Sequence, residues 1–277
     1  MKTLFRLLSP YFTIPALLTI LSCTPVTAEE IKYAPFIVHT IPKCGTHCME
    51  RTIELLIGKT CLAKGLEEKS FLLSKEQNKI VRTIDPYSDE KKAVREKWGY
   101  KMVCIYRDPR DALISHLFYM RTFAGKGLKR DFFVVSKDYD QLSLDDQLTT
   151  LICGKADMSS YLSFYNDRIT WAFDPLTLPI KYEDLVGSHG GGSDIKQREA
   201  IVNIANYLNV ALSDQKLQFV VDNLYQPDAV KSEKHEQFKR ATIGNWKKFF
   251  KPKHKKLFKQ YFGKKLIELR YEKNNNW

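Results

Sequence analysis

A short segment that combines lysine, glycine and threonine has the composition of a phosphate-binding loop: Pro42-Lys43-Cys44-Gly45-Thr46. Lys43 supplies a positive charge, Gly45 lets the backbone approach a ligand closely, and Thr46 adds a hydroxyl. The lysine precedes the glycine, unlike the GxxxxGK[ST] pattern, which disfavours a nucleoside triphosphate hydrolase or kinase. The alternative interpretation is an ordinary turn between a strand and a helix.

A second group of polar residues begins at Arg107-Asp108-Pro109-Arg110-Asp111 and ends at Ser115. Ser115 lies about one turn into the helix expected after this segment. A guanidinium from Arg107 and a hydroxyl from Ser115 can converge on one phosphate, with Arg110 nearby as an auxiliary charge. The alternative is a helix cap and salt bridges made by the two aspartates.

A third segment, residues 239–249, places Lys239 and Arg240 ahead of Gly244 and Trp246. We expect it either to close over a polyanion or to form a basic surface loop anchored by its tryptophan. The whole chain carries a formal charge of +12, which fits nucleic acid, a membrane surface or an anionic small molecule, or simply a solvated basic surface. Because the aromatic residues do not alternate with the basic ones in a nucleic-acid-binding pattern, we expect no nucleic acid partner.

The elements that must position these residues follow from hydrophobic periodicity. Short apolar runs predict strands at 36–40, 79–84, 102–106 and 178–182, and helical spacing predicts helices from Thr46, over 111–120, over 197–208 and over 215–224. Strands alternating with helices predict a parallel sheet flanked by helices. Ligands of such sheets bind beyond the carboxyl ends of the strands, where the first two polar segments lie.

Together with Tyr182-Glu183-Asp184-Leu185, the three segments occur in an order that resembles the sulfotransferases dependent on 3′-phosphoadenosine-5′-phosphosulfate (PAPS), particularly the cytosolic-type and bacterial members. The resemblance covers roughly residues 35–250. It implies a P-loop-like, three-layer α/β fold with a central, mainly parallel sheet. It also implies sulfuryl transfer from PAPS to a hydroxyl or amine acceptor, with release of 3′-phosphoadenosine-5′-phosphate (PAP) and without a metal.

The resemblance assigns expected roles to individual residues. Lys43 is expected to contact the 5′-phosphosulfate and act in catalysis, and Arg107 and Ser115 to hold the 3′-phosphate. Tyr182 matches a position near the adenine. The remaining residues expected to contact the donor are Cys44, Gly45, Thr46, His47 and Cys48 of the loop, Lys239 and Arg240 as the closing pair, and, as a weaker match, Tyr225.

The sequence departs from the family pattern at three places. Ile84 stands where the cytosolic members have a catalytic histidine, so we expect Asp85 to act as the base, with His39 or His47 close enough to help. Cys48 stands in place of a tryptophan under the adenine, and Ala241 replaces a glycine of the closing segment. A catalytically degenerate member that binds nucleotide or an anionic partner is therefore the alternative function, and an exported protein that binds acidic glycans is another.

The N-terminus has the features of a targeting segment. Lys2 and Arg6 precede an apolar run, and Val26-Thr27-Ala28 offers a peptidase site. Cys23 ends a stretch that resembles a lipoprotein box, so a lipid anchor or an uncleaved anchor is the alternative. We expect a signal peptide or anchor over 1–28, one sulfotransferase domain over 29–277, an exported or envelope-associated location, and membrane contact through the N-terminus alone. The acceptor is not identified.

Overall fold

The computed structural model describes residues 33, 35–59, 63–64, 80–121, 138–224 and 242–277. All of them belong to one compact unit, Lys32–Trp277. Within these residues no helix is both long and apolar enough to cross a membrane. The predicted targeting segment, residues 1–28, lies outside the described part of the chain and stays a prediction.

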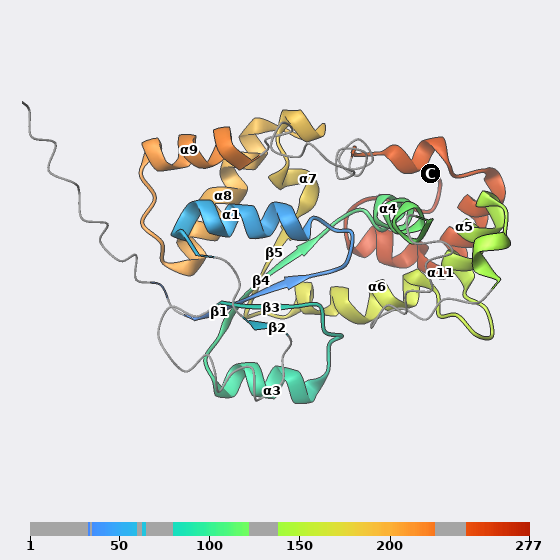
Figure 1. The fold of residues 1–277 in the computed structure, drawn as a ribbon, viewed down its shortest axis with the longest axis horizontal. Helices are drawn as coiled ribbons and strands as arrows, with labels where there is room; N and C mark the ends of the chain where they lie inside the picture. The colour runs from blue at the N-terminus through green and yellow to red at the C-terminus, as the bar shows by residue number, and fades with distance from the viewer. Residues whose placement is uncertain (1–32, 34, 60–62, 65–79, 122–137, 225–241) are drawn as a thin grey trace, which may run out of the picture. The chain divides into compact units, whose positions relative to one another are not determined.

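A parallel sheet forms the centre of this unit (Figure 1). Its strands, in spatial order, are β2 (Ala63–Lys64), β3 (Ile80–Thr83), β1 (Phe36–Thr40), β4 (Lys101–Tyr106) and β5 (Thr177–Lys181). Every neighbouring pair is parallel. β1 is buried along its whole length between β3 and β4, which fits its apolar run Phe36-Ile37-Val38. The predicted parallel sheet is therefore confirmed.

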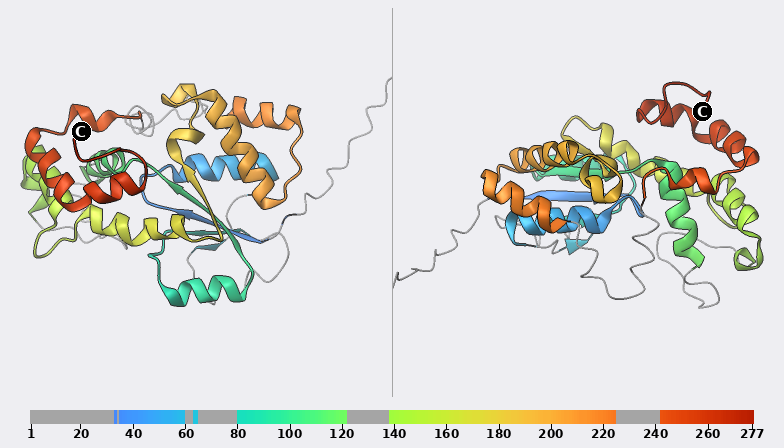
Figure 2. Two further views of the ribbon diagram at one scale, coloured as in Figure 1. Left: turned by 180° about the vertical axis from the view of Figure 1, so that it is seen from behind. Right: turned by 90° about the horizontal axis from the view of Figure 1, so that it is seen from above.

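Helices cover both faces of the sheet. The α-helices of the described residues are α1 (Thr46–Ile57), α3 (Asp89–Lys97), α4 (Pro109–Arg121), α5 (Leu144–Cys153), α6 (Tyr161–Ile169), α7 (Tyr182–Leu185), α8 (Asp194–Leu208), α9 (Asp214–Leu224) and α11 (Pro252–Glu268). The 3-10 helices are η1 (Tyr139–Gln141), η2 (Thr170–Phe173), η3 (Ser188–Gly190) and η5 (Asn245–Lys248). Figures 1 and 2 show α1, α8 and α9 on one face, while α3 and α6 lie on the other. The predicted three-layer α/β fold is thus confirmed.

Alternation along β1 divides the core between the two faces. Phe36 and Val38 belong to the apolar cluster that includes α1, α8 and α9. Ile37 belongs to the opposite cluster, with Trp171 of η2. Because side chains of a strand alternate between faces, one buried strand supports both helical layers.

The C-terminal residues 270–277 hold the turn between β4 and α4. The Tyr271 hydroxyl donates to Glu183 Oε2 at 2.8 Å, and Asp108 N donates to Glu183 Oε1 at 2.9 Å. The guanidinium carbon of Arg110 lies 4.2 Å from the centre of the Trp246 ring and 4.6 Å from that of Trp277.

The guanidinium of Arg110 is paired with carboxylates. Its guanidinium donates to Asp108 Oδ2 at 2.7 Å and to Glu272 Oε1 at 2.5 Å. Since two carboxylates and two tryptophan rings surround this guanidinium, the expectation that Arg110 is an auxiliary charge for a phosphate is wrong. The side chain instead ties α4 to the C-terminal residues.

Burial shifts the pKa of the Glu183 carboxyl group. It raises the pKa of Glu183 from 4.5 to about 7, so the folded protein binds this proton more tightly than the unfolded chain. The stabilising contribution is fully present below about pH 4.5 and is lost as the pH rises through about 7. We predict that Glu183→Gln, which keeps an acceptor for Asp108 N, reduces the fall in melting temperature across this interval.

Asp184→Asn is the matched control, since it removes the neighbouring carboxylate. Thermal unfolding followed by circular dichroism at several pH values provides the comparison. A Glu183→Gln profile with the same slope as the wild type would contradict the assignment.

Candidate active site

The loop between β1 and α1 presents backbone donors at one point. Lys43 and Gly45 adopt positive φ angles of 71° and 100°, which turns the chain sharply after Thr40. The first intrahelical bond of α1 joins Met49 N to Gly45 O at 3.0 Å, so the preceding amides of the first turn point away from the helix. Amides at a helix N-terminus, together with the partial positive charge of the helix dipole, favour an anion.

Gly45 packs directly against Tyr182. A Cβ atom built on Gly45 would lie 2.4 Å from Tyr182 Cδ2 and 3.1 Å from Ile105 Cδ1. The other neighbour of the Tyr182 ring is the Arg107 guanidinium, whose carbon lies 4.7 Å from the ring centre. Tyr182 is 5% exposed, and it begins α7 instead of ending the strand as predicted. The ring therefore joins the loop after β1 to the residue that follows β4.

Aromatic side chains support the loop from the side of α4 and α6. The Tyr161 hydroxyl donates to Pro42 O at 2.8 Å, which fixes the beginning of the turn. The ammonium of Lys43 lies 4.2 Å from the centre of the Tyr119 ring, a distance typical of cation–π attraction. Lys43 thus lies beside α4, which also carries Ser115, a half-buried residue of that helix.

Asp111 is a functional candidate whose role the sequence reading missed. Its Oδ2 accepts from Gly244 N at 2.7 Å and its Oδ1 accepts from Trp246 N at 2.8 Å. Arg107 lies at the same point: its Nη2 is 3.9 Å from Asp111 Oδ2 and donates to Thr242 O at 3.2 Å. Asp111 and Arg107 are 1% and 2% exposed. They anchor the chain two residues after Arg240.

The predicted base, Asp85, follows β3, which neighbours β1. Its backbone N donates to Thr83 Oγ1 at 3.0 Å and its carbonyl accepts from Trp171 Nε1 at 3.2 Å. Its carboxylate lies 4.0 Å from Lys91 Nζ. The loops that carry Lys43, Asp85, Arg107 and Tyr182 therefore all leave the same, carboxyl edge of the sheet.

The two histidines considered as helpers have different environments. His39 is fully buried in β1, and desolvation lowers its pKa from 6.5 to about 3. It stays neutral at physiological pH, with its ring centre 6.2 Å from that of Trp171. His47 is exposed at the start of α1, and its Nδ1 lies 3.2 Å from Glu50 Oε2. The contacts described for His39 and His47 are made with Trp171 and Glu50, and neither of them involves Lys43.

Cys44 of the loop and Cys48 of α1 are free thiols, the first buried and the second partly buried. Cys44 is fully buried, and burial raises its pKa. Burial also raises the pKa of Cys48 to about 12, and Cys48 packs against the cluster under α1. Both are therefore neutral near pH 7. Three residues predicted to contact the donor, Tyr225, Lys239 and Arg240, lie outside the described residues, as does Ala241.

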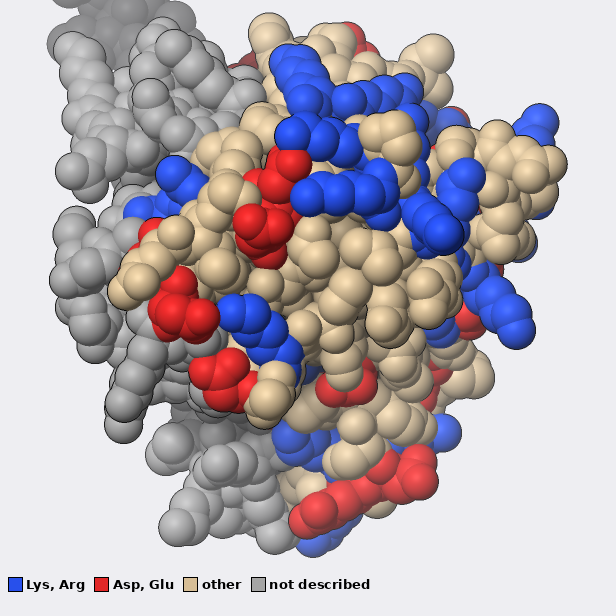
Figure 3. Space-filling model, turned by 90° about the vertical axis from the view of Figure 1, so that its right-hand side faces the viewer, with Lys and Arg blue, Asp and Glu red and all other residues tan. Residues whose placement is uncertain are grey.

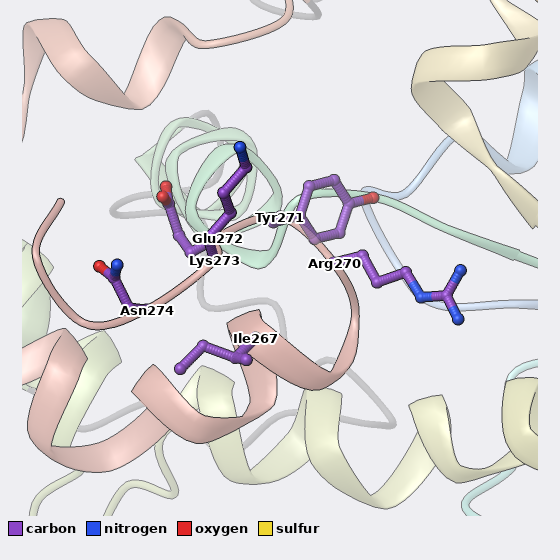
Figure 4. Close-up of a pocket in the computed structure, with 6 residues that line it drawn as sticks. All are labelled: Ile267, Arg270, Tyr271, Glu272, Lys273 and Asn274. Atoms are coloured by element: carbon purple, nitrogen blue, oxygen red, sulfur yellow. The ribbon is translucent and has the colours of Figure 1, made fainter.

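A surface hollow lies between the end of α11 and the C-terminal residues. Ile267, Arg270, Tyr271, Glu272, Lys273 and Asn274 line it (Figure 4). Two of its polar groups are already engaged, since Tyr271 bonds to Glu183 and Glu272 to Arg110. The hollow is not lined by the loop after β1, so we do not assign the chemistry to it. Among the described residues, no group of His, Cys, Asp or Glu could hold a metal ion.

We predict that Asp111→Asn lowers the free energy of unfolding by about 1–3 kcal/mol, because an amide can accept from only one of the two backbone N–H groups and leaves the other unsatisfied. Asp157→Asn is the control, since Asp157 is exposed. Denaturant unfolding measures both. Equal stability of the two variants would contradict the anchoring role of Asp111.

Comparison with known proteins agrees with this geometry. A search of curated proteins finds no match. Among solved structures, the mouse sulfotransferase SULT7A1 complexed with PAP is 18% identical, with a TM-score of 0.59 and 84% of each chain covered. A retinol dehydratase complexed with androsterone and the inactive cofactor PAP is 17% identical (TM-score 0.53), and 84% of this chain and 80% of that one are covered. A retinol dehydratase complexed with retinol and PAP is 15% identical (TM-score 0.56), with 84% and 81% covered.

At these identities the structures show the shared fold. The family model described as "Sulfotransferase domain" matches residues 34–270, which is most of the chain and includes every strand of the sheet. The chain therefore belongs to the sulfotransferase domain family.

Proposed function

We propose that this protein transfers a sulfuryl group from PAPS to a hydroxyl or amine acceptor and releases PAP. The observation that carries the proposal is that two basic side chains follow adjacent parallel strands at the same edge of the sheet. Lys43 precedes the N-terminus of α1, after β1, and Arg107 precedes α4, the helix of Ser115, after β4. We take these as the two places that bind the phosphates. A nucleotide phosphorylated at both its 5′ and 3′ ends matches two such places. The structural neighbours were solved with PAP, which supports this donor.

The anchored segment after Arg240 supports the same donor. Arg107 donates to Thr242 O, and Asp111 holds Gly244 and Trp246. Thr242, which follows Arg240 by two residues in the sequence, thus contacts Arg107. In the proposal, Lys239 and Arg240 supply two more positive charges, which favour a dianionic 3′-phosphate.

The proposed chemistry is an in-line displacement at sulfur. The acceptor oxygen forms a bond to sulfur while the bond from sulfur to the bridging oxygen breaks, and the electron pair leaves with the phosphate. Lys43 and the amides at the start of α1 stabilise the charge that grows on that phosphate. Asp85 takes the proton of the acceptor hydroxyl.

Nucleotide binding tests the donor. We predict that the chain without residues 1–28 binds PAP, and that adenosine 5′-phosphate, which lacks the 3′-phosphate, binds about tenfold or more weakly. Calorimetry measures both affinities. Ser115→Ala should reduce this discrimination, and Ser159→Ala, at an exposed serine elsewhere, should leave it unchanged. Equal affinity of the wild type for the two nucleotides would rule out the assignment of Arg107 and Ser115.

Transfer of labelled sulfate tests the catalytic roles. We predict that Lys43→Ala lowers the transfer rate by about a hundredfold, the usual loss when a positioned charge-stabilising donor is removed. Lys59→Ala is the control, because Lys59 lies beyond the end of α1, near Tyr33. Asp85→Asn should also slow transfer while PAP affinity stays unchanged.

The degenerate alternative makes the opposite prediction for the same assay. If the wild type binds PAP but transfers sulfate to no hydroxyl or amine acceptor, the chain is a nucleotide-binding member without catalysis. The reason to consider this alternative is Ile84, which stands at the position of the histidine of the cytosolic members.

A further inference from the structure

Residues 242–267 have an unusual composition: they contain nine lysines and no aspartate, glutamate or arginine. Five of these lysines are exposed on η5, on the residue before α11 and on the first turns of that helix. We call them the lysine face: Lys247, Lys248, Lys251, Lys253 and Lys256. Figure 3 shows basic side chains gathered over the upper part of this side of the molecule.

Packing explains why these charges point outward. His254 and Phe258 of α11 are fully buried, so the exposed lysines Lys253 and Lys256 lie on the outer side of the helix. Among the described residues, the ion pairs of the five lysines are both made with Asp145, which lies 2.5 Å from Lys251 and 3.4 Å from Lys253. One carboxylate thus offsets a cluster of five positive charges.

The position of the cluster on the helix is electrostatically unfavourable. Lys251 and Lys253 lie at the start of α11, whose first turn contains no acidic residue. The helix dipole places partial positive charge there, so carboxylates, not lysines, stabilise this end. The arrangement costs stability unless an external anion neutralises it, which is what a binding surface for a polyanion requires.

The lysine face borders the candidate active site. Lys247 directly follows Trp246, whose backbone N is held by Asp111. The Phe249 ring centre lies 5.1 Å from that of Phe118 of α4, the neighbour of Tyr119, on which Lys43 rests. A surface hollow lined by Ser143, Leu144, Asp145, Lys248, Phe249 and Lys251 continues this path. These contacts connect the lysine face to α4, the helix on which Lys43 rests, and a long acceptor is the kind of molecule that could span both.

The residue types indicate the class of partner. Lysine is a compact, hydrated charge that suits diffuse attraction, whereas arginine suits paired recognition of single phosphates. Of the exposed large apolar side chains in the described part, only Tyr261 lies on α11, so the face lacks the apolar groups that insert into a membrane. A sulfuryl acceptor must also carry hydroxyl or amine groups, and a uronic acid polymer offers hydroxyl groups on every sugar beside its carboxylates.

We propose that the lysine face binds an acidic polysaccharide whose hydroxyl groups are the acceptors of the reaction. The proposal rests on the proposed function, since it names the acceptor class of that site. It extends to surface residues that the family resemblance does not assign.

Binding of polygalacturonate tests the proposal directly. The full chain should bind fluorescently labelled polygalacturonate, with affinity that falls as salt rises, and should not bind neutral dextran. Replacing Lys248, Lys253 and Lys256 together by Gln should weaken binding about tenfold. The matched control replaces Lys97, Lys155 and Lys196 by Gln, three lysines exposed on other elements. It removes the same charge and should change affinity less than about twofold.

Equal losses in the two triple variants would show that only net charge matters and would overturn the proposal. So would tighter binding to a DNA duplex or to phosphatidylglycerol vesicles than to polygalacturonate. Absence of sulfate transfer to the bound polymer, while a small hydroxyl compound is sulfated, would overturn the acceptor assignment. Calorimetry with PAP on the same proteins separates the two proposals, because failure to bind PAP counts against the donor site alone.

Discussion

The close contact between Gly45 and Tyr182 constrains how the segments at the carboxyl edge of the sheet pack against one another. The ring lies where any side chain on residue 45 would be, so the turn after β1 approaches the start of α7 as closely as a glycine allows. Arg107 also contacts this ring. Tyr182 thereby joins the segments that follow β1, β4 and β5 at one edge of a parallel sheet. The relative position of the amides at the start of α1 and the guanidinium of Arg107 depends on these contacts.

Two carboxyl groups connect the segments around the candidate site to one another. Asp111 accepts from two backbone amides of the segment that follows Arg240, and Glu183 accepts from Asp108 N and from Tyr271. Their oxygens accept from backbone donors and from the Tyr271 hydroxyl, and Asp111 also lies beside Arg107. Lys43, on the other side of the loop, lies over an aromatic ring. The carboxylates thus position the site, while the positive groups are the ones suited to an anionic donor.

Much of this arrangement could be predicted from the sequence, because it depends on local pattern. Apolar runs ending in Pro42 and Arg107 predicted β1 and β4, and the change to helical spacing predicted α1. α3, α5 and α6 were not predicted, although a serine caps each of them: Ser88, Ser143 and Ser160. In α5 the apolar residues Leu144, Leu148 and Leu151 also recur at helical spacing, so the local signal for this helix was present in the sequence and was missed.

Contacts between distant segments could not be predicted in the same way. Arg110 was expected near a phosphate, but it lies between Trp246 and Trp277, more than a hundred residues later in the chain. Asp111 was considered only as a helix cap, because its partners, Gly244 and Trp246, are equally remote. Only the folded chain brings these residues together, and it identifies Asp111 as the residue that accepts from the backbone of Gly244 and Trp246.

The central claim is that two anion-binding places at one sheet edge hold the two ends of one nucleotide. A crystal structure of the protein with PAP tests it most directly. The account predicts the 5′-phosphate against the amides at the start of α1, near Lys43, and the 3′-phosphate in contact with Arg107 and Ser115. A nucleotide bound at another edge, or with its two phosphates exchanged, would contradict it.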